Sequence, residues 1–235
     1  MSDLTASTGK GQVDLVILKF FQTECLIDEN QIVELLGHAG SFLNRVGTNS
    51  LNKQQAEELE ESSGIEGIKI FQGGRQALFG AAFPVDDFPF KYVMIKPYSN
   101  LTLSQIILHC VSLFEFRKQF SGRKYYLSTA PGKDTEEWEV RSVYTIGFGK
   151  LRAGNQNILA LIQEYSEGEK LDSYFKITRI TKDVMKSGFI IDPYISNFRV
   201  TRKHQKNYIE YFDLIFTNQP LDMKIKVKEI TGLDL

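Results

Sequence analysis

The chain has 235 residues and a nearly balanced charge, with 28 Lys and Arg against 29 Asp and Glu. This length suits one large domain or two small ones, and a hydrophobic fraction of 42% supports a sizeable core, which excludes general disorder. The formal net charge of -1 excludes a uniformly basic coat for nucleic acid, so a basic contact surface must be a local patch. Two cysteines exclude a disulfide scaffold, and three histidines leave little material for a metal site.

Signals for a membrane or for secretion are not found in the sequence. No apolar stretch approaches the roughly 20 residues that a membrane-spanning helix needs. The first residues, MSDLT, lack the charged and apolar regions of a signal peptide. We therefore expect a protein that is not secreted and keeps its thiols reduced, either cytoplasmic or, if viral, associated with the virion.

The first part of the chain predicts helices. Residues 1–11 are small and polar, and we expect a loose tail there. Apolar residues at helical spacing predict a first helix over about 13–24, with a stripe wide enough to be buried or offered to a partner. A second helix is expected to begin at Asp28, with Gln31 at capping-box spacing, and to stop at Gly47.

A third expected helix runs from Asn52 to about Glu61, with Ser50 as a candidate cap, and it is strongly acidic. Gly73 and Gly74 then separate two apolar runs, which predicts a tight β-hairpin. Three helices and a hairpin occur in this order in winged helix-turn-helix domains. A DNA-reading role is disfavoured because the glutamates of the third helix would lie in the major groove and repel phosphates. A helical subdomain that packs or assembles is the preferred interpretation.

Two domains are expected, and the segment 84–89 is the candidate boundary because it combines two prolines with two aspartates. Residues 12–83 would form the helical subdomain with its hairpin. Residues 90–235 would form an antiparallel α+β domain.

The second expected domain begins with a strand over 90–97 and a long helix from Ser99 or Asn100 to about Phe120. From Arg123 onward, apolar and polar residues alternate, which predicts antiparallel strands with short connections. The expected strands include Trp138–Phe148, Asn157–Tyr165, Ser173–Ile180, Tyr194–Thr201, Tyr208–Phe216 and Met223–Ile230. The predicted fold class is therefore α+β: a helical part with a hairpin, then a mostly antiparallel sheet packed with one long helix.

Motifs for catalysis or for a cofactor are missing. Gly132 and Lys133 lack the leading glycine of a phosphate-binding loop, and Asp134 stands where Ser or Thr should bind magnesium. Gly147 and Gly149 lie within a strand pattern, which does not suit a dinucleotide fingerprint. No Gly-x-Ser-x-Gly sequence occurs. We therefore name no catalytic residue, cofactor or metal ligand, and we favour a protein that is not an enzyme.

His109 and Cys110 are adjacent in the long helix, where neighbouring side chains point about 100° apart and cannot readily share a metal ion. Cys110 lies on the apolar face and is expected in the core, whereas His109 is expected to be solvated.

Two clusters of cations are the most suggestive feature of the sequence. The segment from Phe198 to Tyr208 contains no acidic residue, and its cations and aromatic rings could grip phosphates and stack on bases. A second basic cluster ends the long helix. The candidate anion-binding or nucleic-acid-binding residues are Arg199, Arg202, Lys203, His204, Lys206, Arg117, Lys118, Arg123 and Lys124. The alternative interpretation is a solvated hairpin tip and an ordinary basic helix end.

The leading functional hypothesis is a structural or assembly protein, without catalytic activity, that self-associates and contacts an anionic partner through these clusters. The first alternative is a module that binds RNA or single-stranded nucleic acid. The second is a small-molecule or lipid carrier whose sheet is closed by the long helix. An anionic membrane surface would also suit the clusters, at about 1 kcal/mol per basic residue.

Overall fold

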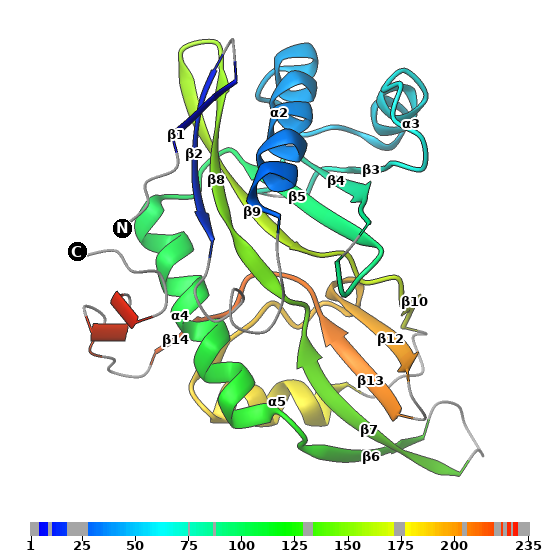
Figure 1. Cartoon of the computed structure of the whole chain (residues 1–235). Helices are drawn as coiled ribbons and strands as arrows, with labels where there is room; N and C mark the ends of the chain where they lie inside the picture. The colour runs from blue at the N-terminus through cyan, green and yellow to red at the C-terminus, as the bar shows by residue number, and fades with distance from the viewer. Residues whose placement is uncertain are drawn as a thin grey trace. The chain divides into compact units, whose positions relative to one another are not determined.

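The computed structural model describes residues 5–8, 11–17, 28–74, 76–86, 88–128, 134–171, 177–203, 206–218, 222, 225–226 and 228–229. The described chain combines helices with mostly antiparallel sheets, as Figure 1 shows, and the predicted α+β class is confirmed. It divides into two compact units. Unit 1 comprises Met1–Ile106, Tyr144–Tyr165 and Val227–Leu235, and unit 2 comprises Ile107–Val143 and Ser166–Lys226.

Unit 1 contains a seven-stranded sheet in the order β1-β2-β8-β9-β5-β4-β3, in which every neighbouring pair is antiparallel. Its strands are β1 (Thr5–Thr8), β2 (Gly11–Ile17), β3 (Lys69–Gln72), β4 (Phe79–Pro84), β5 (Tyr92–Tyr98), β8 (Thr145–Ala153) and β9 (Gln156–Glu164). The strands β4 and β5 pair directly, with Ala81 opposite Ile95. The segment 84–89 therefore connects two neighbouring strands of one sheet, which differs from the expected boundary between domains.

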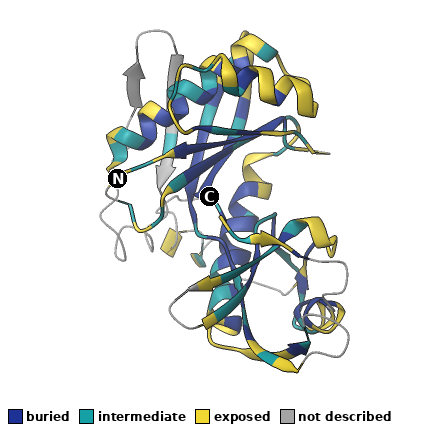
Figure 2. Cartoon of the chain, turned by 90° about the vertical axis from the view of Figure 1, so that its right-hand side faces the viewer, coloured by how far each residue is buried: buried dark blue, intermediate teal, exposed yellow. Residues whose placement is uncertain are grey.

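Helix α2 (Glu29–Val46) packs on this sheet and begins and ends where the sequence predicted. The carboxylate of Asp28 accepts a hydrogen bond of 2.9 Å from the Asn30 amide, and Gly47 ends the helix with a φ of 73°. Figure 2 shows buried residues of the sheet beneath the helices of unit 1. Gly149 of β8 permits a close approach, because a Cβ there would lie 2.7 Å from Cδ1 of Leu36.

Helix α3 (Lys53–Glu61) lies where the sequence predicted, but its N-cap is Asn52 rather than Ser50. Asn52 and Gln55 form a reciprocal capping box, with hydrogen bonds of 2.9 Å and 3.0 Å. The buried residues Ala56 and Leu59 attach the helix to the core of unit 1.

The N-terminal residues differ from the prediction. The described part of the expected first helix, 13–17, belongs to strand β2, which pairs with both β1 and β8. Residues 5–8 of the expected loose tail form β1. Within a continuous apolar run, periodicity cannot distinguish a buried strand from a helix. The pairing with β8, which favours the strand, forms only in the folded unit. The rest of the expected helix, 18–24, lies outside the described residues.

The expected hairpin is present, but its loop is longer than a two-residue turn. Gln72 of β3 lies opposite Phe79 of β4, so residues 73–78 form the connection. Gly73 is required by backbone proximity, because a Cβ there would overlap the carbonyl oxygen of Leu78 and lie 2.7 Å from that of Ala77.

Unit 2 contains most of helix α4 (Leu103–Phe120) and a five-stranded sheet in the order β10-β12-β13-β7-β6. Thr102 and Gln105 exchange hydrogen bonds at the start of α4, two or three residues after the expected caps. The strands β13 and β7 are parallel, and the other pairs are antiparallel. The elements are β6 (Lys124–Ser128), β7 (Thr135–Ser142), β10 (Glu169–Lys170), α5 (Thr178–Lys186), β11 (Phe189–Ile190), η1 (Ile195–Asn197), β12 (Phe198–Lys203), β13 (Lys206–Tyr211) and β14 (Phe216–Thr217).

Five of the expected strands differ from the structure. Residues 195–197 of the expected strand 194–201 form the short helix η1, and the expected strand 208–216 is divided between β13 and β14. The alternation over 138–148 is divided between β7 and β8, which belong to different sheets. Residues 178–180 begin helix α5, because Ile180 and Val184 have the i, i+4 spacing of a buried helical face; residues 173–176 lie outside the described part. Of the expected last strand, the described residues 225–226 and 228–229 are helical.

Candidate anion-contact surfaces

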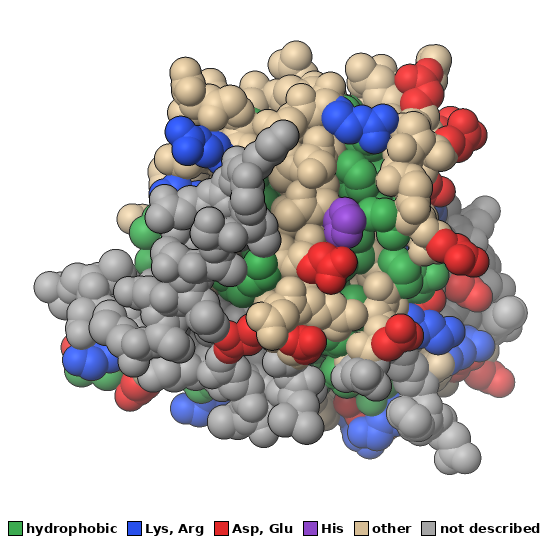
Figure 3. All heavy atoms as spheres, turned by 45° about the horizontal axis from the view of Figure 1, so that its top comes forward, with side chains coloured by type: hydrophobic (Ala, Val, Ile, Leu, Met, Phe, Trp, Pro, Cys, Tyr) green, Lys and Arg blue, Asp and Glu red, His purple; other side chains and the backbone are tan. Residues whose placement is uncertain are grey.

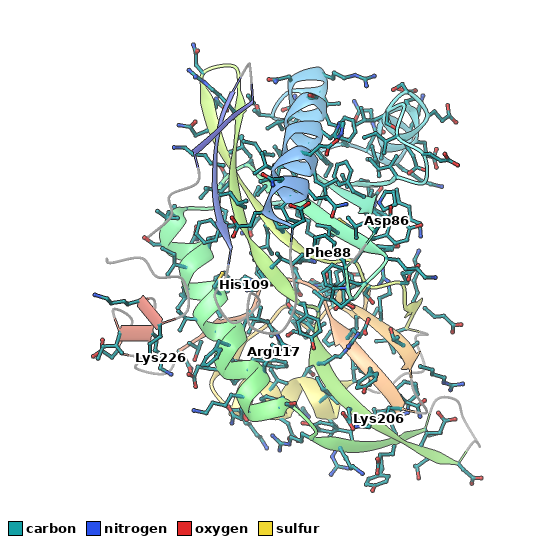
Figure 4. The ribbon with its side chains drawn as sticks, viewed as in Figure 1. Asp86, Phe88, His109, Arg117, Lys206 and Lys226 are labelled. Carbon is teal, nitrogen blue, oxygen red and sulfur yellow. The ribbon has the colours of Figure 1, made fainter. Side chains whose placement is uncertain are left out.

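The predicted basic hairpin is formed by β12 and β13. Lys203 lies opposite Lys206, which is labelled in Figure 4 at the start of β13. His204 and the side chain of Lys203 lie outside the described residues. Both Arg202 and Lys206 are exposed, as the sequence predicted.

Glutamates of β7 neutralise the described cations at this hairpin. Arg202 pairs with Glu136 at 3.1 Å, and Lys206 pairs with Glu139 at 3.0 Å. The hydrogen bond to Glu139 raises the pKa of Lys206 above its ordinary value. A polyanion at this hairpin would have to displace these glutamates, since it would meet their negative charge as well as the cations.

Lys124 of β6 is paired in the same way. Its Nζ lies 2.8 Å from Glu137, whose carboxylate also accepts a 2.9 Å hydrogen bond from the Tyr126 hydroxyl. These two hydrogen bonds lower the pKa of Glu137, and the first raises the pKa of Lys124. Lys124 is therefore held within a charge network on the sheet.

Arg199 is engaged at the start of β12. Its guanidinium lies 4.6 Å from the centre of the Phe212 ring and donates hydrogen bonds to the carbonyl oxygens of Ser196 and Phe198 at 3.1 Å and 2.9 Å. These contacts fix Arg199 near its own backbone.

The second predicted cluster lies where α4 ends and β6 begins. Arg123 pairs with Asp183 of α5 at 3.5 Å and lies 5.1 Å from the centre of the Phe120 ring. Arg117, labelled on α4 in Figure 4, is half-buried, and Lys118 is exposed. The structure thus brings this cluster together with α5.

Helix α5 carries cations that the sequence analysis did not select. Arg179, Lys182 and Lys186 are exposed and spaced at i, i+3 and i+7, which places them on one helix face. We call these three residues the α5 basic face. Within the part of the chain that the structure describes, no acidic group forms an ion pair with them; the neighbouring Asp183 pairs with Arg123 instead. The helical spacing of Ile180 and Val184 was the signal that could have found this face.

Aromatic packing connects α5 to the end of α4. The Phe189 ring, just after α5, lies 5.4 Å from that of Phe116 and 5.9 Å from that of Phe120. Figure 1 shows α5 beside the last turns of α4 and the start of β6. The α5 basic face therefore stands on the aromatic core of unit 2.

The balanced charge of the chain conceals a division between the units. Unit 2 contains 17 Lys and Arg against 13 Asp and Glu, whereas unit 1 contains 11 against 16. In unit 1, acidic side chains gather over α3, as Figure 3 shows. The positive excess thus belongs to the unit that carries α5.

A buried ion pair was missed by the sequence analysis. Glu210 of β13 is 1% exposed and accepts hydrogen bonds from Arg141 of β7 and from the Ser166 hydroxyl. The Arg141 guanidinium also lies 4.9 Å from the centre of the Tyr208 ring. The alternation of apolar and polar residues gave no sign that this carboxylate is buried. The cluster stabilises the pairing of β7 with β13, and we assign it no role in ligand binding.

The expectation that His109 is solvated is wrong. His109 is 2% exposed, and its Nδ1 accepts a 2.9 Å hydrogen bond from the Ile215 amide, because the segment before β14 covers this side of α4. Cys110 is in the core as expected, and burial raises the pKa of its thiol to about 12.

No group of three metal-ligating side chains occurs among the described residues. Within the same residues, no helix is long and apolar enough to cross a bilayer.

Comparisons of the chain with protein-family models, with curated proteins and with solved structures find no match.

Proposed function

We propose that the chain is a structural or assembly protein that contacts an anionic partner through the α5 basic face. The observation that supports this proposal is the set of three exposed cations without a described acidic partner, in the unit with the positive excess. Such a surface attracts an anion over a distance of about 8–10 Å in physiological salt. Lys118, at the exposed end of α4, adds a further cation in unit 2.

The proposal ranks the α5 basic face above the β12–β13 hairpin. The hairpin cations Arg202 and Lys206 already contact glutamates of the same sheet. Binding of an anion there would exchange one ion pair for another, and the released glutamates would repel the ligand. At α5, none of the described acidic residues forms an ion pair with the three cations, so binding there would need no such exchange among the described residues.

Binding of single-stranded nucleic acid is a second candidate, supported by the outer face of the five-stranded sheet. Tyr126, which is 60% exposed, and Tyr208 lie on the same face as Lys124 and Lys206, as the pairing registers require. Exposed rings beside cations on a sheet suit stacking on unpaired bases. Glutamates of β7 occupy the same face, which makes this the weaker candidate.

The proposal is tested with two variants that remove cations from different surfaces. The first is R179Q/K182Q/K186Q, and the control, which removes two cations from the hairpin, is R202Q/K206Q. Binding is measured by fluorescence anisotropy with labelled poly-L-glutamate and with single-stranded poly(U), from 20 to 200 mM salt. We expect the α5 variant to bind poly-L-glutamate at least tenfold more weakly, and the hairpin variant to bind as the wild type does.

Equal binding of poly-L-glutamate by the α5 variant and the wild type would contradict the proposal. Loss of poly(U) binding in the hairpin variant alone would support the second candidate instead. Thermal unfolding of both variants provides the control, because exposed substitutions of this kind shift stability little.

A further inference from the structure

We infer that the anionic partner of the α5 basic face is helix α3 of a second copy of this chain. This inference rests on the proposed function and names its partner. Each copy offers both surfaces, so the contact either closes into a two-fold dimer or continues head to tail.

The outward face of α3 is acidic. Glu57, Glu58 and Glu61 are exposed and lie within about 100° of the helix circumference, opposite the buried residues Ala56 and Leu59. Their partners among the described residues are few. Glu57 has a single cation nearby, Lys53 at 3.6 Å, and Glu58 accepts a hydrogen bond from the neutral amide of Gln54.

Glu60 has a different role and is left out of this face. Its carboxylate accepts a 2.6 Å hydrogen bond from the Ile70 amide of β3, the last strand of the seven-stranded sheet. This bond covers an N–H group that would otherwise offer the sheet edge to another strand. The structure therefore favours a contact between copies through helix faces over one through this edge.

The two helix faces are complementary in charge and comparable in length. The three cations of α5 extend over about 10 Å along the helix axis, and the three acids of α3 over about 6 Å, at 1.5 Å per residue. The long side chains of Arg179, Lys182 and Lys186 can bridge that difference. Each helix carries only one residue of the opposite charge: Lys53 is the only cation on α3, and Asp183 is the only acid on α5. Repulsion between the two faces is therefore small.

The charge of the whole units acts in the same direction. Unit 1 of one copy has a negative excess, and unit 2 of another has a positive excess. Attraction between unlike units steers the encounter, and repulsion between like units disfavours other pairings. Exposed ion pairs are individually weak, so association should be strongest at low salt and high protein concentration.

The test measures self-association of the full chain by sedimentation velocity at 20 and 300 mM salt. We expect the average mass to rise with concentration at 20 mM salt and to return to the 26.8 kDa of a monomer at 300 mM. R179E/K182E/K186E and E57K/E58K/E61K should each be monomeric alone. A mixture of the two should associate, because each variant then presents the charge that the other lacks. R202Q/K206Q should associate as the wild type does.

The inference is overturned if the wild type remains monomeric at 20 mM salt, or if the mixture of folded variants does not associate. Circular dichroism shows whether the variants are folded, and E57Q/E58Q/E61Q replaces the lysine variant if that one is not. A monomeric wild type that still binds poly-L-glutamate through α5 would remove this inference and leave the proposed function standing. If the α5 variant kept both poly-L-glutamate binding and self-association, the proposed function and this inference would both be contradicted.

Discussion

Arg141 and Glu210 lie directly opposite each other in the parallel pair of strands β7 and β13, and the arginine donates two hydrogen bonds to one carboxylate oxygen of the glutamate. Ser166 donates to the other carboxylate oxygen. Removing one partner from this buried cluster is destabilising, because the groups that remain are then left with unsatisfied hydrogen-bond donors or acceptors.

Replacing Glu210 tests this relationship. We expect Glu210→Ala to lower the free energy of unfolding by about 3 kcal/mol, since it leaves a partly buried guanidinium without its counter-ion. The double variant Arg141→Met with Glu210→Leu should lose less than Glu210→Ala, because no charge is then left unpaired. Urea unfolding measures both, with Lys206→Gln as the exposed control. A loss below 1 kcal/mol for Glu210→Ala would contradict the role of the pair.

Gly73 and the adjacent Gly74 form a matched pair for a test of backbone proximity. A Cβ at Gly73 would lie 2.7 Å from the Ala77 carbonyl oxygen and 2.8 Å from Cβ of Ser50, whereas a Cβ at Gly74 has no neighbour within 4 Å. We expect Gly73→Ala to cost about 2 kcal/mol and Gly74→Ala to stay within about 0.5 kcal/mol. Equal melting temperatures for the two variants would show that the loop adapts.

The buried thiol of Cys110 is expected to be unreactive and to make stability depend on alkaline pH. Burial raises the pKa of the folded thiol to about 12, so the unfolded chain ionises first as pH rises above about 9. The unfolded state then binds fewer protons than the folded state, and the free energy of unfolding falls between pH 9 and 12.

Thiol labelling at pH 8 and urea unfolding at pH 8 and 10 check this prediction in a Cys25→Ser background. We expect no labelling of the folded protein. The fall in stability from pH 8 to 10 should be smaller in the Cys110→Ala variant, which lacks the thiol. Rapid labelling without denaturant would mean that Cys110 is accessible.

His109 is expected to stabilise the segment before β14 by accepting a hydrogen bond from the Ile215 amide. We expect His109→Ala to lower the free energy of unfolding by about 2 kcal/mol, since it leaves a buried N–H unsatisfied and opens a cavity. Amide exchange at Ile215 should become faster. The control is His38→Ala on α2, where the side chain is 43% exposed and little change is expected. Unchanged protection of Ile215 would contradict the assignment.

The sequence predicted the elements whose signals are local. Asp28 and Gly47 limit α2 through a cap and a left-handed glycine, and both act within a few residues of chain. The α+β class and the strand that corresponds to β9 were predicted from the spacing of apolar residues, which is also a pattern of neighbouring residues. The candidate cations were found because charged residues can be read directly from the sequence. Which of these cations are neutralised by ion pairs could not be read from it.

Tertiary structure decided the elements and pairings that depend on distant residues. Residues 15–17 became part of a strand because β8 offers them a partner more than a hundred residues away. The glutamates of β7 neutralise the hairpin cations because a parallel pairing places Glu139 beside Tyr208. The α5 basic face depends on a helix whose β-branched residues resemble a strand in the sequence. Local capping and periodicity are properties of a short segment, whereas register and ion pairing are fixed only when the chain brings separate segments together.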